Sequence, residues 1–113
     1  MKNYTHTAFE ILDMMYYINV ATCDDKMVPW NSIVYWAFDR DLNIFWSSAV
    51  DAVHSKNISI HPHVFFTVYD STTPLGVFRQ QGVYIQANAR ELVDPEEIAD
   101  AREITQSRKG KKS

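Results

Sequence analysis

Two hydroxyl groups and two potential cations lie close together near the middle of the sequence. Ser47 and Ser48 follow a run of apolar and aromatic residues, and His54 and Lys56 come a few residues later. A phosphate group binds best where several hydrogen-bond donors and positive charges converge. The spacing therefore predicts a phosphate site in which Ser47 supplies a hydroxyl and His54 and Lys56 supply charge.

The two potential cations do not point the same way on a helix. His54 and Lys56 are two positions apart, so an ideal helix separates them by about 200°. One of them is therefore expected to be the main contact, and the long side chain of Lys56 favours that residue. If His54 contributes as a cation, ligand affinity should fall as the pH rises through its pKa, because the charge is then lost.

Flat aromatic side chains precede the predicted phosphate site. Trp46 comes directly before Ser47, and Trp30 and Trp36 lie in the strand-like stretch before that. Such rings can cover a planar ligand, although in a small β protein they also form the core or a subunit interface. A phosphate joined to an aromatic ring system indicates flavin mononucleotide (FMN) as the cofactor.

Length and charge limit the class of protein. The chain has 113 residues, which fits one domain, and its formal net charge of −3 argues against nucleic acid as a partner. No stretch approaches the ~20 apolar residues of a membrane span, and the N-terminus lacks a signal-peptide pattern. Cys23 is the single cysteine and cannot form an internal disulfide, so the expected location is the cytoplasm. The role of Cys23 stays open.

Hydrophobic periodicity predicts a mainly β domain with short helices. Five antiparallel strands are expected, at 16–23, 28–38, 42–47, 63–70 and 82–93. Helices are expected at 5–15, 49–60 and 94–104, with a loop at 71–80. Strands in one small domain favour a barrel, because closure removes exposed edges. We expect a single domain at 1–106 and a basic, disordered tail at 107–113.

The order and spacing of several short motifs carry a resemblance to a known family. The motifs are Ile18-Asn19-Val20-Ala21-Thr22, Val28-Pro29-Trp30, Phe45-Trp46-Ser47-Ser48, His54-Ser55-Lys56-Asn57, His61-Pro62-His63-Val64, Phe66-Thr67-Val68-Tyr69-Asp70-Ser71-Thr72 and Gln81-Gly82-Val83-Tyr84-Ile85. Together they resemble the pyridoxamine-5'-phosphate-oxidase-like FMN-binding split barrels over roughly residues 9–98.

The resemblance implies an antiparallel, six-stranded split β-barrel. It also implies a homodimer with a flavin in each of two clefts between the subunits. The backbone of Asn31, Ser32 and Ile33 would run along the flavin ring, with Trp46 and Ser47 near the ribityl chain and phosphate. His54 and Lys56 match positions of phosphate-binding cations, and Gln81 would come from the other side of the cleft.

The sequence departs from the family pattern in two places. Asn31 and Trp36 stand where the oxidase carries an arginine and a lysine for the cofactor. The sequence also ends at Ser113, before the family's C-terminal strand and the oxidase's substrate-binding residues. We therefore expect a barrel that lacks this strand, and no pyridoxamine-phosphate oxidase activity.

Two classes of function remain open. The first is an FMN-dependent oxidoreductase of unknown small-molecule substrate, whose chemistry the cofactor supplies. The second is a non-catalytic, dimeric binding module for flavin, haem or another planar ligand. A deazaflavin in place of FMN, or no cofactor at all, remains an alternative. A metal site is not expected, because His61 and His63 lie too close together in the sequence and lack a third ligand nearby.

Overall fold

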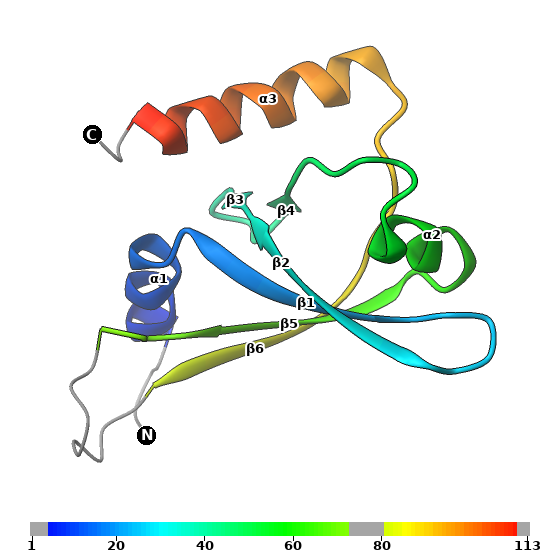
Figure 1. Ribbon diagram of the computed structural model, residues 1–113. Coiled ribbons are helices and arrows are strands. Elements are labelled where there is room, and N and C mark those ends of the chain that lie inside the picture. Colours follow the sequence, from blue (N-terminus) through cyan, green and yellow to red (C-terminus); the bar gives the residue numbers. More distant parts are fainter. Residues whose placement is uncertain (1–4, 73–80, 111–113) are drawn as a thin grey trace.

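Six strands and three helices make up the described part of the chain, residues 5–72 and 81–110 of this computed structural model (Figure 1). In chain order they are α1 (Thr5–Met14), β1 (Tyr17–Cys23), β2 (Pro29–Tyr35), β3 (Ala37–Phe38), β4 (Ile44–Phe45), α2 (Val53–Ile60), β5 (His63–Tyr69), β6 (Gly82–Asn88) and α3 (Pro95–Gly110). Most of the loop expected at 71–80 lies outside the described residues.

The strands form two antiparallel sheets. The larger has the order β2-β1-β5-β6, and the smaller is the β3-β4 hairpin. The expected mainly β, antiparallel architecture is confirmed. The described residues form no closed barrel, however, and they leave β2 at one edge of the four-stranded sheet. The architecture is therefore an open sheet with a separate hairpin.

The strand expected at 28–38 is divided at Trp36. Trp36 and Ala37 are both fully buried, which breaks the in-and-out alternation of a strand. The Trp36 indole N–H donates to the Met15 carbonyl at 2.9 Å, and its ring stacks on Phe38. The prediction of one continuous strand was wrong, because Trp36 points into the core and lies between the end of β2 in one sheet and the start of β3 in the other.

The core lies between the inner face of the large sheet and α1. Val20 and Phe66 pair across β1 and β5, and both are almost completely buried. Ile11 and Leu12 of α1 pack in the same cluster. Along β6 the inward side chains are Val83, Ile85 and Ala87, as the alternation predicted.

The opposite side of the large sheet, here called the outer face, is rich in exposed apolar and aromatic residues. Its large members are Tyr17, Ile33, Phe65, Tyr69 and Tyr84. Ile33 is 72% exposed and Tyr84 is 71% exposed. Monomeric proteins rarely expose several such residues on one surface, so the outer face is a candidate contact surface.

The last helix is longer than expected and is held by an arginine. α3 continues to Gly110, past both 104 and the expected start of the tail at Ser107. The Arg108 guanidinium donates to the carbonyls of Leu12 (2.8 Å) and Met15 (2.6 Å) at the end of α1. It also lies over the rings of Tyr16, Trp36 and Phe38. These contacts give Arg108 a fixed position that composition alone does not predict.

Arg108→Ala should destabilise the fold. The change removes two charge-assisted hydrogen bonds and the aromatic contacts, and hydrogen bonds to charged groups contribute about 1.5–3 kcal/mol each. Arg108→Lys should restore only part of the loss, because lysine cannot bond both carbonyls and stack as a planar group. Urea unfolding measures the difference.

Arg102→Ala is the matched control for this prediction. Arg102 is exposed on the same helix, so its free energy of unfolding should stay within about 0.5 kcal/mol of wild type. Equal unfolding midpoints for the Arg102 and Arg108 variants would contradict the anchoring role.

Candidate functional site

A buried hydrogen bond holds α2 against the sheet. The Asn57 side-chain N–H donates to the Thr22 hydroxyl of β1 at 3.0 Å, and both residues are 4% exposed. The helix has no side-chain cap, because its N-cap residue is Ala52. Because α2 is short and uncapped, its position depends on this contact with β1.

The orientation of α2 places His54 between two serines. Its Nδ1 lies 3.0 Å from the Ser32 hydroxyl of β2, and its Nε2 lies 2.6 Å from the Ser48 hydroxyl in the β4–α2 connection. The Trp30 indole N–H donates to the same Ser32 oxygen at 2.9 Å. We call Trp30, Ser32, Ser48 and His54 the His54 cluster. It joins β2 to α2, 22 positions apart at Ser32 and His54, and to the connection that leads into α2.

The His54 ring is shielded enough to change its titration. Burial lowers the pKa of His54 from its ordinary value near 6.5, because the charged form is less well solvated. The ring is therefore largely neutral at pH 7. This works against the cationic role that the sequence suggested for His54.

The structure brings His54, rather than Lys56, to the hydroxyls. Lys56 lies exposed on α2, about 200° around the helix from His54. Ser47 is exposed, and it is the next residue, Ser48, that bonds His54. Nothing in the described residues tests the anion-binding roles of Lys56 and Ser47, which stay predictions.

The three tryptophans occupy different environments. Trp36 is in the core, and Trp46 packs edge-on against Phe66 with ring centroids 5.7 Å apart. Trp30 is 49% exposed, and its N–H is fixed by Ser32. Trp30 is therefore the tryptophan best placed to cover a ligand ring, whereas Trp46 is mainly part of the core packing.

The free edge of β2 offers backbone groups beside the cluster. The Trp36 N–H donates to the Tyr16 carbonyl at 3.3 Å. Residues of an antiparallel pair alternate between bonding the partner strand and pointing away from it. This alternation directs the Ser32 backbone to β1 and the backbone groups of Asn31 and Ile33 to the open edge. That geometry suits the predicted passage of a ligand ring along this strand.

Gln81 lies far from the other predicted residues within one chain. It precedes β6, where its carbonyl accepts the Asp70 N–H at 2.9 Å. β5 and β6 pair from Tyr69–Gly82 at this end to His63–Asn88 at the other, and α2 leads into the His63 end. A single chain therefore does not bring Gln81 to the His54 cluster.

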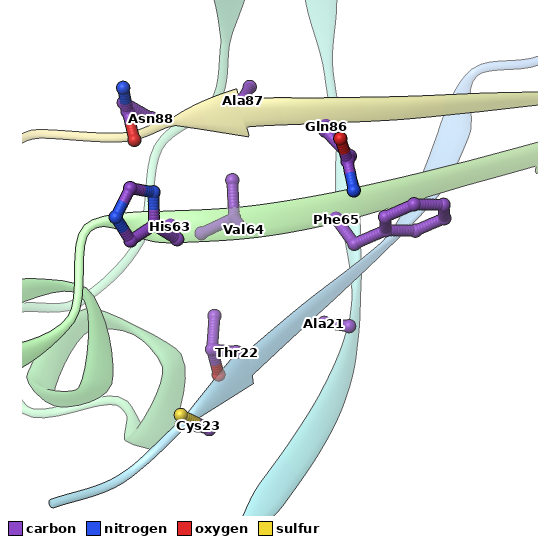
Figure 2. Close-up of a pocket in the computed structure, with 9 residues that line it drawn as sticks. All are labelled: Ala21, Thr22, Cys23, His63, Val64, Phe65, Gln86, Ala87 and Asn88. Carbon is purple, nitrogen blue, oxygen red and sulfur yellow. The ribbon is translucent and has the colours of Figure 1, made fainter. Parts of the chain in front are cut away.

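A separate depression of about 700 Å³ opens on the outer face of the sheet (Figure 2). Its lining comes from β1, β5 and β6, and includes Cys23, His63, Phe65 and Gln86. None of the predicted site residues lines it. The depression and the predicted site residues thus lie in different places. We place the candidate site at the His54 cluster, where polar contacts converge.

No helix within 5–72 and 81–110 combines the length and apolar character needed to cross a membrane. In the same residues, no group of three or more His, Cys, Asp or Glu side chains is arranged to hold a metal ion.

Sequence reasoning missed two members of the cluster. Ser48 was recognised only as the neighbour of Ser47, and Trp30 only as one of several strand aromatics. The alternation of side chains along a strand could have indicated Trp30, because Trp30 and Ser32 are two positions apart and lie on the same face of β2. The contact between β2 and α2 depends on tertiary packing, and no local pattern predicts it.

Acid should weaken the fold through His54. Its pKa is lowered in the folded state, so the unfolded chain binds more protons between that pKa and about 6.5. Stability from this group is complete above pH 6.5 and is lost as the pH falls through the folded pKa. Urea unfolding of wild type and His54→Gln from pH 7.5 to 5 measures the effect.

The substituted glutamine does not titrate, so the two proteins should differ less in stability at pH 5 than at pH 7.5. The other histidines are common to both proteins and cancel in the comparison. Parallel losses of stability across the whole pH range would show that burial of His54 has no energetic consequence.

The fold is similar to that of solved proteins. A haem-binding protein from Mycobacterium smegmatis matches with a TM-score of 0.79 at 18% identity, covering 92% of this chain and 42% of that one. HutZ, the haem storage protein from Vibrio cholerae, matches with a TM-score of 0.74 at 16% identity, covering 96% and 81%. ChuZ from Campylobacter jejuni matches with a TM-score of 0.79 at 14% identity, covering 97% and 46%.

The chain thus spans from less than half to about four fifths of the length of these proteins. No protein-family model matches the sequence, and no curated protein matches it. At these identities the likeness concerns the fold alone. The chain has the split-barrel-like fold of these structures.

Proposed function

We propose that this protein is a binding module for a planar ligand that carries an anionic side group, with haem as the first candidate. The His54 cluster beside the partly exposed Trp30 ring is the observation that supports this proposal. Two proteins with this fold are described as haem-binding and haem-storing, which favours haem among planar ligands.

The donors around the cluster suit an anionic group. Ser47, Ser48 and Lys56 are exposed and close in sequence to His54. Their hydroxyl and ammonium groups donate hydrogen bonds, which haem carboxylates and a flavin phosphate both accept. The proposed site therefore binds the anionic end of either ligand with the same residues.

Apolar side chains beside these donors suit a flat ring. Trp30 offers an indole face, and Val50 and Val53 flank the donors in sequence with exposed side chains. Burying such surface against a ring is favourable by about 25 cal/mol per Å². The cluster fits haem carboxylates better than haem iron, because both His54 ring nitrogens already contact serines.

The second candidate is an FMN-dependent oxidoreductase acting on a small molecule. The open edge of β2 favours it, since the backbone groups of Asn31 and Ile33 can bond the polar rim of a flavin or deazaflavin ring. A porphyrin ring has an apolar rim and gains nothing from that edge. Reduction of the bound flavin by a nicotinamide donor would favour this candidate.

The proposed module is a homodimer that pairs through the outer face. Tyr17, Ile33 and Tyr84 leave apolar surface exposed there, and a second copy can bury it. Gln81, which is remote from the cluster within one chain, would contribute to the ligand site from the partner subunit. An obligate interface of this kind buries more than about 2,000 Å².

Hemin and FMN titrations followed by visible absorbance test the ligand. At least one should bind with a perturbed spectrum, and Trp30→Ala should weaken binding about tenfold by removing the ring contact. Val93→Ala, which removes an exposed apolar side chain between β6 and α3, is the control. Absence of binding for both ligands would refute the proposed function.

Lys56→Ala in the same titrations tests the anionic end. A hydrogen bond from a charged donor contributes about 1.5–3 kcal/mol, so affinity should fall roughly ten- to hundredfold. Lys26→Ala removes an exposed lysine from the β1–β2 turn and should leave affinity unchanged. Equal affinities for the two lysine variants would show that the anionic group of the ligand does not bind beside α2.

Sedimentation at micromolar concentration tests the dimer. Wild type should sediment as a dimer, whereas Tyr84→Glu should shift it toward monomer, because pairing would bury two new charges. Arg102→Glu, on the exposed side of α3, should leave the mass unchanged. A monomeric wild type would exclude the proposed pairing.

A further inference from the structure

We propose that the His54 cluster is a directional hydrogen-bonded chain that turns the Ser48 hydroxyl proton outward, so that the site selects ligands with an anionic oxygen at that point. The direction of the chain follows from contacts within the protein. Only the identity of the ligand rests on the proposed function.

The chain begins at Trp30. An indole N–H is a donor and never an acceptor, so its 2.9 Å contact assigns an acceptor role to the Ser32 oxygen. A serine hydroxyl has two lone pairs and one proton. After this bond, Ser32 retains one lone pair and its proton for the contact with His54 Nδ1 at 3.0 Å.

Two arrangements of a neutral His54 are compatible with the distances. With the ring proton on Nε2, Ser32 donates to Nδ1, the Nε2–H donates to Ser48, and the Ser48 proton is left over. With the ring proton on Nδ1, that N–H donates to Ser32, Ser48 donates to Nε2, and the Ser32 proton is left over. The arrangements differ in which serine keeps an unused proton.

Burial decides between the two arrangements. Ser32 is half-buried, and no further partner for its hydroxyl is found among residues 5–72 and 81–110. Ser48 is exposed, so water or a ligand can accept its proton. An unsatisfied polar group costs more where water cannot reach it. The Nε2–H arrangement is therefore favoured, and it directs the Ser48 proton outward.

The same geometry assigns His54 a positioning role. With one ring nitrogen on Ser32 and the other on Ser48, it orients Ser48 through the 2.6 Å contact. The lowered pKa of His54 agrees with a neutral bridge. Asp51 and Lys56, the charged groups on the adjacent loop and on α2 itself, are both exposed.

The outward proton determines which ligands fit. A phosphate or carboxylate oxygen accepts it, whereas a neutral ester or an alcohol gains less, because bonds to charged acceptors are roughly twice as strong. The site should therefore discriminate between ligands that share a ring and differ in the side group. FMN and riboflavin form such a pair, as do hemin and its dimethyl ester.

The first experiment measures the His54 tautomer by nitrogen-15 NMR at pH 8, without ligand. The proposal predicts that Nε2 carries the proton in wild type. Ser32→Ala removes the half-buried hydroxyl whose proton decides between the two arrangements, so in that variant the tautomers should mix. A proton on Nδ1 in wild type would overturn the inference, whether or not any ligand binds.

The second experiment measures affinity for FMN against riboflavin, and for hemin against its dimethyl ester, at pH 8. Wild type should prefer the anionic member of the pair it binds by tenfold or more. Ser48→Ala and His54→Ala should each lose most of this preference, and the double variant should lose no more, because the two residues act as one unit. Ser48→Thr should retain the preference.

A His54→Ala protein that keeps its preference at pH 8, where the ring is neutral, would exclude the bridge. A Ser48→Ala protein that keeps the preference would show that a residue other than Ser48 donates to the anionic group. If wild type binds none of the four ligands, the proposed function fails, and the tautomer measurement still decides the direction of the chain.

Discussion

The buried hydrogen bond between Asn57 and Thr22 fixes the position of α2, and the candidate site depends on that position. Both side chains are almost completely removed from water, so loss of either partner would leave a polar group unsatisfied in the core. Because α2 lacks a side-chain cap, it is held by this bond together with the packing of Ile58 against the core and the contact of His54 with Ser32. His54 lies one turn before Asn57 and is thereby placed between β2 and the β4–α2 connection.

The second constraint is the inward turn of Trp36. Its burial ends β2 and starts the separate β3-β4 hairpin. The division leaves β2 as an edge strand whose backbone is open beside Trp30 and Ser32. Arg108 closes the same region from the other side by bonding the end of α1 and lying over the Trp36 ring. The chain is thus closely packed around Trp36 at the end of β2, whereas the backbone edge of β2 beside Trp30 and Ser32 is open.

Local patterns in the sequence predicted most of the elements but only part of the site. Alternation along β6 and the polar turns between strands identified the antiparallel sheet, because period-two burial is a local property. The division at Trp36 and the anchoring by Arg108 depend on contacts with Met15, far away in sequence, and could not be predicted from a local window. In the same way, the long side chain of Lys56 made it the favoured contact from the sequence, whereas tertiary packing brought His54 to the serines.

The central claim is that a planar, anionic ligand binds beside the His54 cluster, and indole NMR signals test it most directly. Trp30 and Trp36 each have an N–H in a defined bond, one exposed beside the cluster and one in the core. Titration with FMN or with diamagnetic zinc protoporphyrin should move the Trp30 signal and leave the Trp36 signal in place. An unmoved Trp30 signal, with shifts instead at Phe65 and Gln86 in the outer-face depression, would contradict the account.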